Sequence, residues 1–199
     1  MKREYRVDGW VRAAMLLLCV SCLTAPKLAA QVYAASTGTV DTASVGTYEF
    51  VNGSAYVKSG LATGTVTLRF NVLPVGDLLV PVTQPCCEGR ALMVRFLDNG
   101  PGANVTVVLK RYDVVTGVIT TVLSFNSDNY APSSTFQWFV PTIGNSALVN
   151  LDFATGPFNG DQNEGGGTGV YFLEATLTRS AAGGTPGLGT ISIVRTLAP

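Results

Sequence analysis

Carboxylates are the side chains of this chain best suited to acid–base chemistry, because the sequence contains no histidine. Without an imidazole, neither a Ser-His-Asp nor a Cys-His nucleophile can be assembled. Two carboxyl groups held about 5–10 Å apart could still hydrolyse a glycosidic bond. The acids after residue 30 are scattered without a motif around any pair, and Asp98 reads as a turn residue able to pair with Arg95. A glycoside hydrolase is therefore the least favoured interpretation, and we predict a non-catalytic protein.

Three oxygen-bearing side chains lie close together in a glycine-rich segment, residues 155–169. Asp161, Asn163 and Glu164 could curl around a hard cation, because calcium prefers carboxylate and amide oxygens. The segment lacks the third ligand and the closing glutamate of an EF-hand loop. Solvated turn residues are therefore the favoured interpretation. Calcium is the alternative, and no other cofactor is predicted.

Aromatic side chains could provide a platform on which sugar rings stack. Trp138 is the only tryptophan after residue 30, with Tyr130 upstream of it and Phe158 in the glycine-rich segment. In an extended strand Phe136 and Trp138 share one face, and Phe139 points to the other. One of these faces must join the core. Core packing of Trp138 is the favoured interpretation, and exposed contact with a ligand is the alternative.

Cys86 and Cys87 are the two cysteines that follow residue 30, and they are adjacent. A disulfide between neighbours requires a strained ring, since disulfides prefer Cα atoms well over about 4 Å apart. Three states remain open: that ring in a surface loop, two free thiols, or a bond to another chain. No disulfide can close a long loop within this part of the chain.

The elements that must position these residues are short β-strands. Segments rich in Val, Thr, Leu, Phe and Tyr are separated by Gly, Asn, Asp and Pro, and no helical period is sustained. The segments before and after a short glycine-containing connector, residues 113–117, predict a hairpin. Repeated short strands predict an all-β fold, an antiparallel two-layer β-sandwich of jelly-roll type. Strands are expected over residues 47–51, 65–72, 92–97, 105–112, 118–125, 135–140, 147–153, 170–178 and 190–195.

Three segments outside these strands look irregular. Residues 31–46, rich in Ala, Ser, Thr and Gly, are predicted to form a flexible lead-in. Residues 74–89, which hold prolines and both cysteines, and residues 155–169 are predicted to be long loops. The sandwich is then a single domain over residues 47–199, a length that supports a sizeable core.

The first 30 residues have the pattern of a cleavable signal peptide. A basic start leads into an apolar run over residues 13–25 and then into small residues near Ala30. The run is shorter than the roughly 20 residues that a membrane-spanning helix needs. Export to an extracellular or periplasmic location is therefore predicted, without a membrane span in the remainder. Lipid attachment at Cys22 is disfavoured, because Cys19 stands where such a site expects an aliphatic residue.

Charge argues against two classes of partner. Of the 13 basic and 13 acidic residues, five basic and two acidic ones lie before residue 31, so the remainder carries a net charge of −3. No basic run is left in it. Nucleic acid and anionic membranes are therefore not expected as partners.

The sequence thus predicts a secreted, non-catalytic structural or interaction component of the cell surface or extracellular matrix. Sparse charge and a positive mean hydropathy, +0.32, favour self-association. The alternative is an extracellular carbohydrate-binding module that uses exposed aromatic residues, an expectation by analogy with other secreted β-sandwiches. The expected partners are a second copy of the chain or a polysaccharide.

Overall fold

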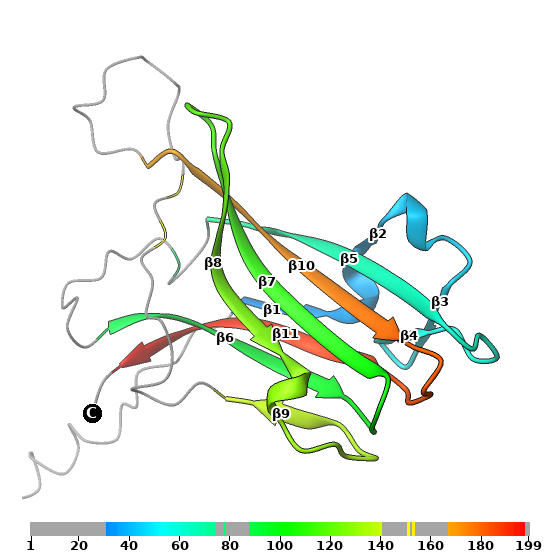
Figure 1. Ribbon diagram of the computed structural model, residues 1–199. Helices are drawn as coiled ribbons and strands as arrows, with labels where there is room; N and C mark the ends of the chain where they lie inside the picture. The colour runs from blue at the N-terminus through cyan, green and yellow to red at the C-terminus, as the bar shows by residue number, and fades with distance from the viewer. Residues whose placement is uncertain are drawn as a thin grey trace, which may run out of the picture.

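The structure, a computed structural model, describes residues 31–74, 88–140 and 167–197, together with Leu78, Leu151 and Phe153. In this part of the chain, β-strands are joined by turns and short 3-10 helices (Figure 1). The helices are η1 (Ala35–Thr37), η2 (Thr42–Ser44) and η4 (Ser127–Asn129). None of the described helices is long and apolar enough to span a membrane.

Two antiparallel sheets form the layers of a sandwich (Figure 1). Sheet A has the order β3-β4-β11-β6-β9, with β1 also paired to β11; sheet B has the order β2-β5-β10-β7-β8. The strands of sheet A are β1 (Gln31–Ala34), β3 (Tyr48–Val51), β4 (Ser54–Val57), β6 (Glu88–Leu97), β9 (Gln137–Phe139) and β11 (Gly187–Leu197). Those of sheet B are β2 (Thr39–Val40), β5 (Gly64–Val72), β7 (Ala103–Asp113), β8 (Ile119–Asn126) and β10 (Gly169–Arg179).

The pairing of the last eight strands is that of a jelly roll. β7 pairs with β8, β6 with β9, β5 with β10 and β4 with β11, so that each pair encloses the previous one along the chain. Such nesting describes one long antiparallel ribbon, closed by the β7–β8 hairpin and wrapped into two layers. The expected jelly-roll sandwich is confirmed.

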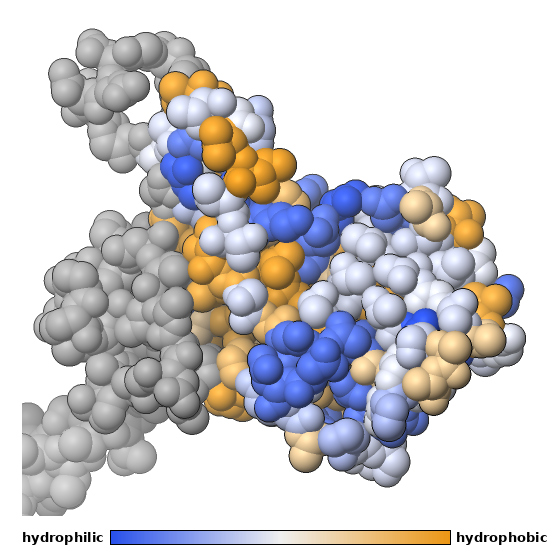
Figure 2. Space-filling model, viewed as in Figure 1, coloured by the Kyte–Doolittle hydropathy of each residue, from blue (hydrophilic) through white to orange (hydrophobic). Residues whose placement is uncertain are grey.

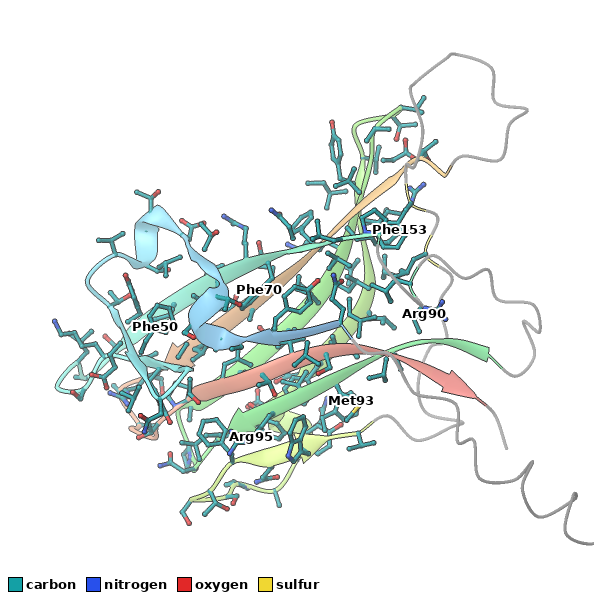
Figure 3. The ribbon with its side chains drawn as sticks, turned by 180° about the vertical axis from the view of Figure 1, so that it is seen from behind. Phe50, Phe70, Arg90, Met93, Arg95 and Phe153 are labelled. Carbon is teal, nitrogen blue, oxygen red and sulfur yellow. The ribbon has the colours of Figure 1, made fainter. Side chains whose placement is uncertain are left out.

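The core lies between the sheets and follows from the alternation within each strand. In β5, Val66, Leu68 and Phe70 are buried, whereas Arg69 between them is exposed. Figure 3 shows Phe70 between the two layers. The same alternation in the central strands buries Val94, Phe96, Val107, Leu109, Leu173, Ala175, Ile191 and Ile193. Each central strand therefore has one core-facing side and one outer side on which other side chains can act.

Most of the expected strands are present, with ends that shift by a few residues. The hairpin around residues 113–117 is formed by β7 and β8, which pair from Tyr112 and Ile119 onward. The strand expected over 147–153 lies largely outside the described residues; within it, Phe153 is buried and forms a bridge to Gly169.

The interpretation of residues 31–46 as a flexible lead-in is wrong. Along β1, Tyr33 lies opposite Ile191 of β11, and β2 pairs with β5. The Asp41 carboxylate caps η2 by accepting a hydrogen bond from the backbone N–H of Ala43, at 3.1 Å. Ring contact between Tyr33 and Phe70, with centroids 5.7 Å apart, ties the segment to the core. These residues belong to both layers of the sandwich.

Candidate binding surface on sheet A

β9 brings Trp138 to the outer side of sheet A. The strand pairs with β6 and places Trp138 opposite Arg95. The next residue, Phe139, packs against the core, and its ring centroid lies 5.3 Å from that of Phe125. Because neighbouring strand residues point to opposite sides, Trp138 faces solvent and is 53% exposed. Core packing of Trp138, which the sequence favoured, is therefore wrong, since Phe139 fills the core side of β9.

Two further aromatic rings lie near Trp138 on this side. Phe136, two residues before Trp138, meets Tyr56 edge-on with ring centroids 6.1 Å apart. Tyr56 belongs to β4 and lies opposite Gly187 of β11. A Cβ atom at Gly187 would stand 2.9 Å from the Tyr56 ring, so glycine leaves the space that this ring occupies. Tyr56, Phe136 and Gly187, which are distant in sequence, are thereby brought together on one side of the sheet.

Arg95 lies between the aromatic residues. Its guanidinium carbon is 4.5 Å from the centre of the Phe136 ring, within the range of a cation–π contact. On β11, the register with β6 shifts between Leu188 and Thr190, so that Gly189 is an extra residue beside Arg95. A Cβ atom at Gly189 would lie 3.2 Å from Arg95 Nη1. The bulge therefore provides room for the guanidinium next to the Phe136 ring.

We call Tyr56, Phe136, Trp138 and Arg95 the aromatic strip. All four are partly or largely exposed, and they come from β4, β6 and the segment that contains β9. Within the described part of the chain, the side chain of Arg95 has no ion-pair or hydrogen-bond partner. The strip thus combines ring faces with one cationic donor that the fold does not use.

The rest of this outer side is weakly polar. In the row next to Arg95 and Trp138, Met93 lies opposite Ser192, and Ser192 lies opposite Val32. Val32 is 59% exposed. Figure 3 shows Met93 and Arg95 along β6, beside β9. The acid that the register places on this side, Glu49, is on β3, three strands from β6, and accepts two hydrogen bonds from Ser59. Glu49 thus lies opposite Tyr56 at one end of the strip, and none of the described carboxylates forms an ion pair with Arg95.

The outer side of sheet B carries a charged network instead. Glu174 accepts from Lys110 Nζ at 2.6 Å and from Arg69 Nε at 3.0 Å, and Arg69 also donates to Asp41 at 2.6 Å. Burial raises the pKa of Glu174, but the hydrogen bonds from Lys110 and Arg69 outweigh it and hold the pKa below its usual value. The hydrogen bonds from the Ala43 N–H and Arg69 likewise lower the pKa of Asp41.

Four of the described carboxylates accept hydrogen bonds within the fold and do not form an acid pair; they are those of Asp41, Asp98, Asp113 and Glu174. Asp98 is buried and accepts a hydrogen bond from the Ser127 hydroxyl at 2.6 Å, so the expected pair between Asp98 and Arg95 does not form. Asp113 accepts from the backbone N–H groups of Val115 and Thr116. The lowered pKa values of Asp41 and Glu174 suit anions rather than a general acid, which needs a raised pKa.

Tyr130 lies at the core side of β9 and is not part of the aromatic strip. Its ring stacks on Phe125, with centroids 5.6 Å apart, and also contacts Phe96 and Phe139. Burial raises the pKa of its phenol, although part of the residue is exposed. The structure therefore does not bring Tyr130 and Trp138, two predicted ligand contacts, onto one surface.

The other predicted site residues lie outside the described residues. They are Phe158, the calcium candidates Asp161, Asn163 and Glu164, and the cysteines Cys86 and Cys87. Among the residues that the structure does describe, no group of three or more His, Cys, Asp or Glu side chains could hold a metal ion. Phe136, Tyr56 and Arg95 were not singled out as ligand contacts from sequence; the alternation that pairs Phe136 with Trp138 was the one available signal.

Comparisons with known proteins found distant structural matches alone. No family model and no curated protein matches this chain. Among solved structures, a xylan-binding module, CBM15, is 9% identical with a TM-score of 0.41, and the match covers 86% of this chain and 99% of that one. The protein PfGH50B is 11% identical with a TM-score of 0.34, covering 86% of this chain and 22% of that one. At these scores neither match bears on function.

Proposed function

We propose that this chain is a secreted, non-catalytic carbohydrate-binding protein that takes a polysaccharide on the aromatic strip. The observation that carries the proposal is the exposure of Trp138, 53%, beside Phe136 and Arg95 on the outer side of a sheet. An exposed indole gains little for the fold, whereas its face can cover the apolar C–H face of a sugar ring. Clustered exposed aromatic residues mark binding surfaces more often than single ones do.

The rigid position of the strip supports this function. Trp138 and Arg95 are held by paired strands rather than by a loop, so binding would not have to order the backbone that carries them. An exposed sheet surface can bind sugars in the interior of a polysaccharide and does not require its terminal sugars. A long glycan could therefore lie across the strip and extend beyond it on both sides.

Affinity electrophoresis through gels that contain a soluble polysaccharide tests this function. The panel comprises xylan, glucomannan, β-glucan and polygalacturonate, and the full chain is compared with Trp138→Ala. Retardation by at least one polymer is expected, and Trp138→Ala should lose about tenfold in affinity, since stacking on one large ring contributes about 1–2 kcal/mol. Tyr112→Ala is the matched control, because Tyr112 is an exposed aromatic residue, 39%, on β7 of the other sheet.

Two results would contradict the proposal. One is the absence of retardation in every gel of the panel; the other is equal retardation of Trp138→Ala and the unchanged chain. Urea unfolding of each variant shows whether the fold is intact. If Trp138→Ala does not fold, Trp138→Leu keeps apolar bulk without the ring face and takes its place.

A structural role with self-association is the second candidate, and the β7–β8 hairpin is the observation that favours it. Val115, Val118 and Ile119, at and beside its turn, are 49%, 53% and 57% exposed. Figure 2 shows hydrophobic residues over this end of the molecule. Light scattering over a concentration series tests the role: growth into defined assemblies that Ile119→Asp abolishes supports it, and a monomer at all concentrations refutes it.

A further inference from the structure

The charge of Arg95 distinguishes the aromatic strip from a surface built for neutral sugars. In the register row that joins Trp138, Arg95, Thr190 and Ala34, Arg95 is the one charged residue, and the nearest acid on this side by register, Glu49 of β3, lies opposite Tyr56, three strands from β6. On sheet B, by contrast, Arg69 and Lys110 are each paired with a carboxylate. A guanidinium that the fold leaves without an anion is available to one from outside.

The placement of Arg95 also leaves its hydrogen-bonding edge usable. The guanidinium carbon lies over the Phe136 ring at 4.5 Å, and Gly189 leaves space on the β11 side. This contact is not a hydrogen bond, so it uses none of the five N–H donors of the guanidinium. Those donors form a fixed fork that matches the two oxygens of a carboxylate. The contact with the Phe136 ring reduces the freedom that Arg95 would otherwise lose on binding.

From this geometry we infer that the strip binds a polysaccharide that carries carboxylates, a uronate polymer, with one uronate on Arg95 and a neighbouring ring on Trp138. This inference rests on the proposed function. The excess of acidic residues after residue 30 does not oppose it, because charges more than about 8 Å apart are largely screened at physiological ionic strength. The contact is therefore local, between one guanidinium and one carboxylate.

Polygalacturonate and the same polymer after reduction of its carboxylates to alcohols provide the test. Both are offered to the full chain in affinity electrophoresis, and the ring shape stays constant while the charge is removed. We expect the reduced polymer to bind about tenfold more weakly, as the loss of one charge-assisted, two-pronged contact implies. Arg95→Gln should bind both polymers equally, at the level that the unchanged chain shows for the reduced one.

Two variants sharpen the test. Arg69→Gln removes an arginine from the outer side of sheet B and should leave the preference for the acidic polymer unchanged. Arg95→Lys keeps the charge but loses the fork, and should retain less than half of the preference. The inference is overturned if the two polymers bind equally, if Arg95→Gln keeps the preference, or if Arg95→Lys keeps all of it.

The failure of this inference and that of the proposed function give different results. If neutral polymers bind through Trp138 and the acidic polymer has no advantage, the carbohydrate-binding function stands and the uronate assignment falls. If no polymer is bound, acidic or neutral, both fall together. Binding of dextran sulfate as strong as that of polygalacturonate would also overturn the assignment, because it would show attraction to any polyanion.

Discussion

The outer sides of the two sheets solve the same problem in different ways. Sheet B faces solvent with charges that satisfy one another, since Glu174 bridges Arg69 and Lys110 and Arg69 reaches Asp41. Sheet A faces solvent with aromatic rings and a guanidinium, Arg95, that pairs with no described acid. Both sides cover the same core. The charged groups on sheet B therefore engage one another, whereas Arg95 and the exposed Trp138 of sheet A have no such charged partner among the described residues.

This contrast explains why the number of charged residues on a surface is a poor guide to its function. A carboxylate that already accepts two charged hydrogen bonds has little to offer a partner, because binding would first have to break them. A ring or guanidinium with an open face loses only water on binding. The outer side of sheet A, with fewer paired charges than that of sheet B, is thus the better candidate for ligand recognition.

The largest stability difference between the two sides should come from Glu174→Gln. The neutral amide leaves Lys110 and Arg69 without their shared anion, and we expect a loss of about 1–2 kcal/mol in the free energy of unfolding. Arg95→Gln should cost about 0.5 kcal/mol, the value of an exposed cation–π contact. Urea unfolding at pH 7 measures both.

The two variants should also differ in polysaccharide affinity, and here Arg95→Gln should have the larger effect. Glu174→Gln is expected to leave polysaccharide affinity unchanged, because Glu174 lies on the other layer. Equal losses of stability in the two variants would break the contrast, since Arg95 would then be part of the fold as Glu174 is.

Acid should destabilise the fold through two carboxylates of the charged network on sheet B, those of Asp41 and Glu174. The pKa values of Asp41 and Glu174 are lowered in the folded chain from 3.8 and 4.5, so the unfolded chain takes up protons first as the pH falls. Their contribution is present above about pH 5 and is lost progressively below it, as the pH passes through the folded pKa values. The urea concentration at the midpoint of unfolding should therefore decrease as the pH is lowered from 5 to 3.

The control for this acid dependence is the Glu174→Gln variant. It lacks one of the depressed carboxyl groups, so its loss of stability between pH 5 and pH 3 should be smaller than that of the unchanged chain. Arg95→Gln should be slightly less stable than the unchanged chain by the same amount at every pH, so that the two curves run parallel. A Glu174→Gln curve parallel to that of the unchanged chain would show that Glu174 does not contribute to the acid dependence.

Alternation along the strands made the architecture predictable from sequence, but three of the short strands, β1, β2 and β4, were not predicted. β5 was found because its apolar and polar residues alternate over nine residues, and β10 because an apolar start is followed by alternation from Leu173 to Thr178. β1, β2 and β4 have four residues or fewer, and β1 and β2 lie in a segment rich in Ala, Ser and Thr. Such segments become strands because a partner strand accepts them, which local sequence does not encode.

The site was predictable in part, for a related reason. Alternation correctly placed Phe136 and Trp138 on one side of a strand, but aromatic residues occur on both sides, and Phe139 takes the core position. Hydrophobicity alone cannot choose between two such faces. Tyr56 and Arg95 join the strip through the pairing of β4, β11 and β6, contacts set by register and by a bulge far away in sequence.

The substitution Gly189→Ala, which should have the smallest effect, tests how Arg95 is held in position. The new Cβ atom would lie 3.2 Å from Arg95 Nη1 and 3.3 Å from both its Cγ and its backbone oxygen, so the Arg95 side chain would have to shift slightly and its contact with the Phe136 ring would weaken. We expect affinity for polygalacturonate to fall about threefold, since an exposed cation–π contact is worth about 0.5–1 kcal/mol. Isothermal titration with oligogalacturonate measures the change.

A double-mutant cycle separates this effect from general damage to the bulge. Made in the Arg95→Gln background, Gly189→Ala should change oligogalacturonate affinity no further, because the side chain that it displaces is gone. If the two losses add instead, Gly189 acts on the sheet as a whole, and Arg95 owes its position to Phe136 alone. An additive result would mean that the two sheets differ only in their exposed side chains. A coupled result would mean that they also differ in the backbone, through the bulge at Gly189 that positions Arg95.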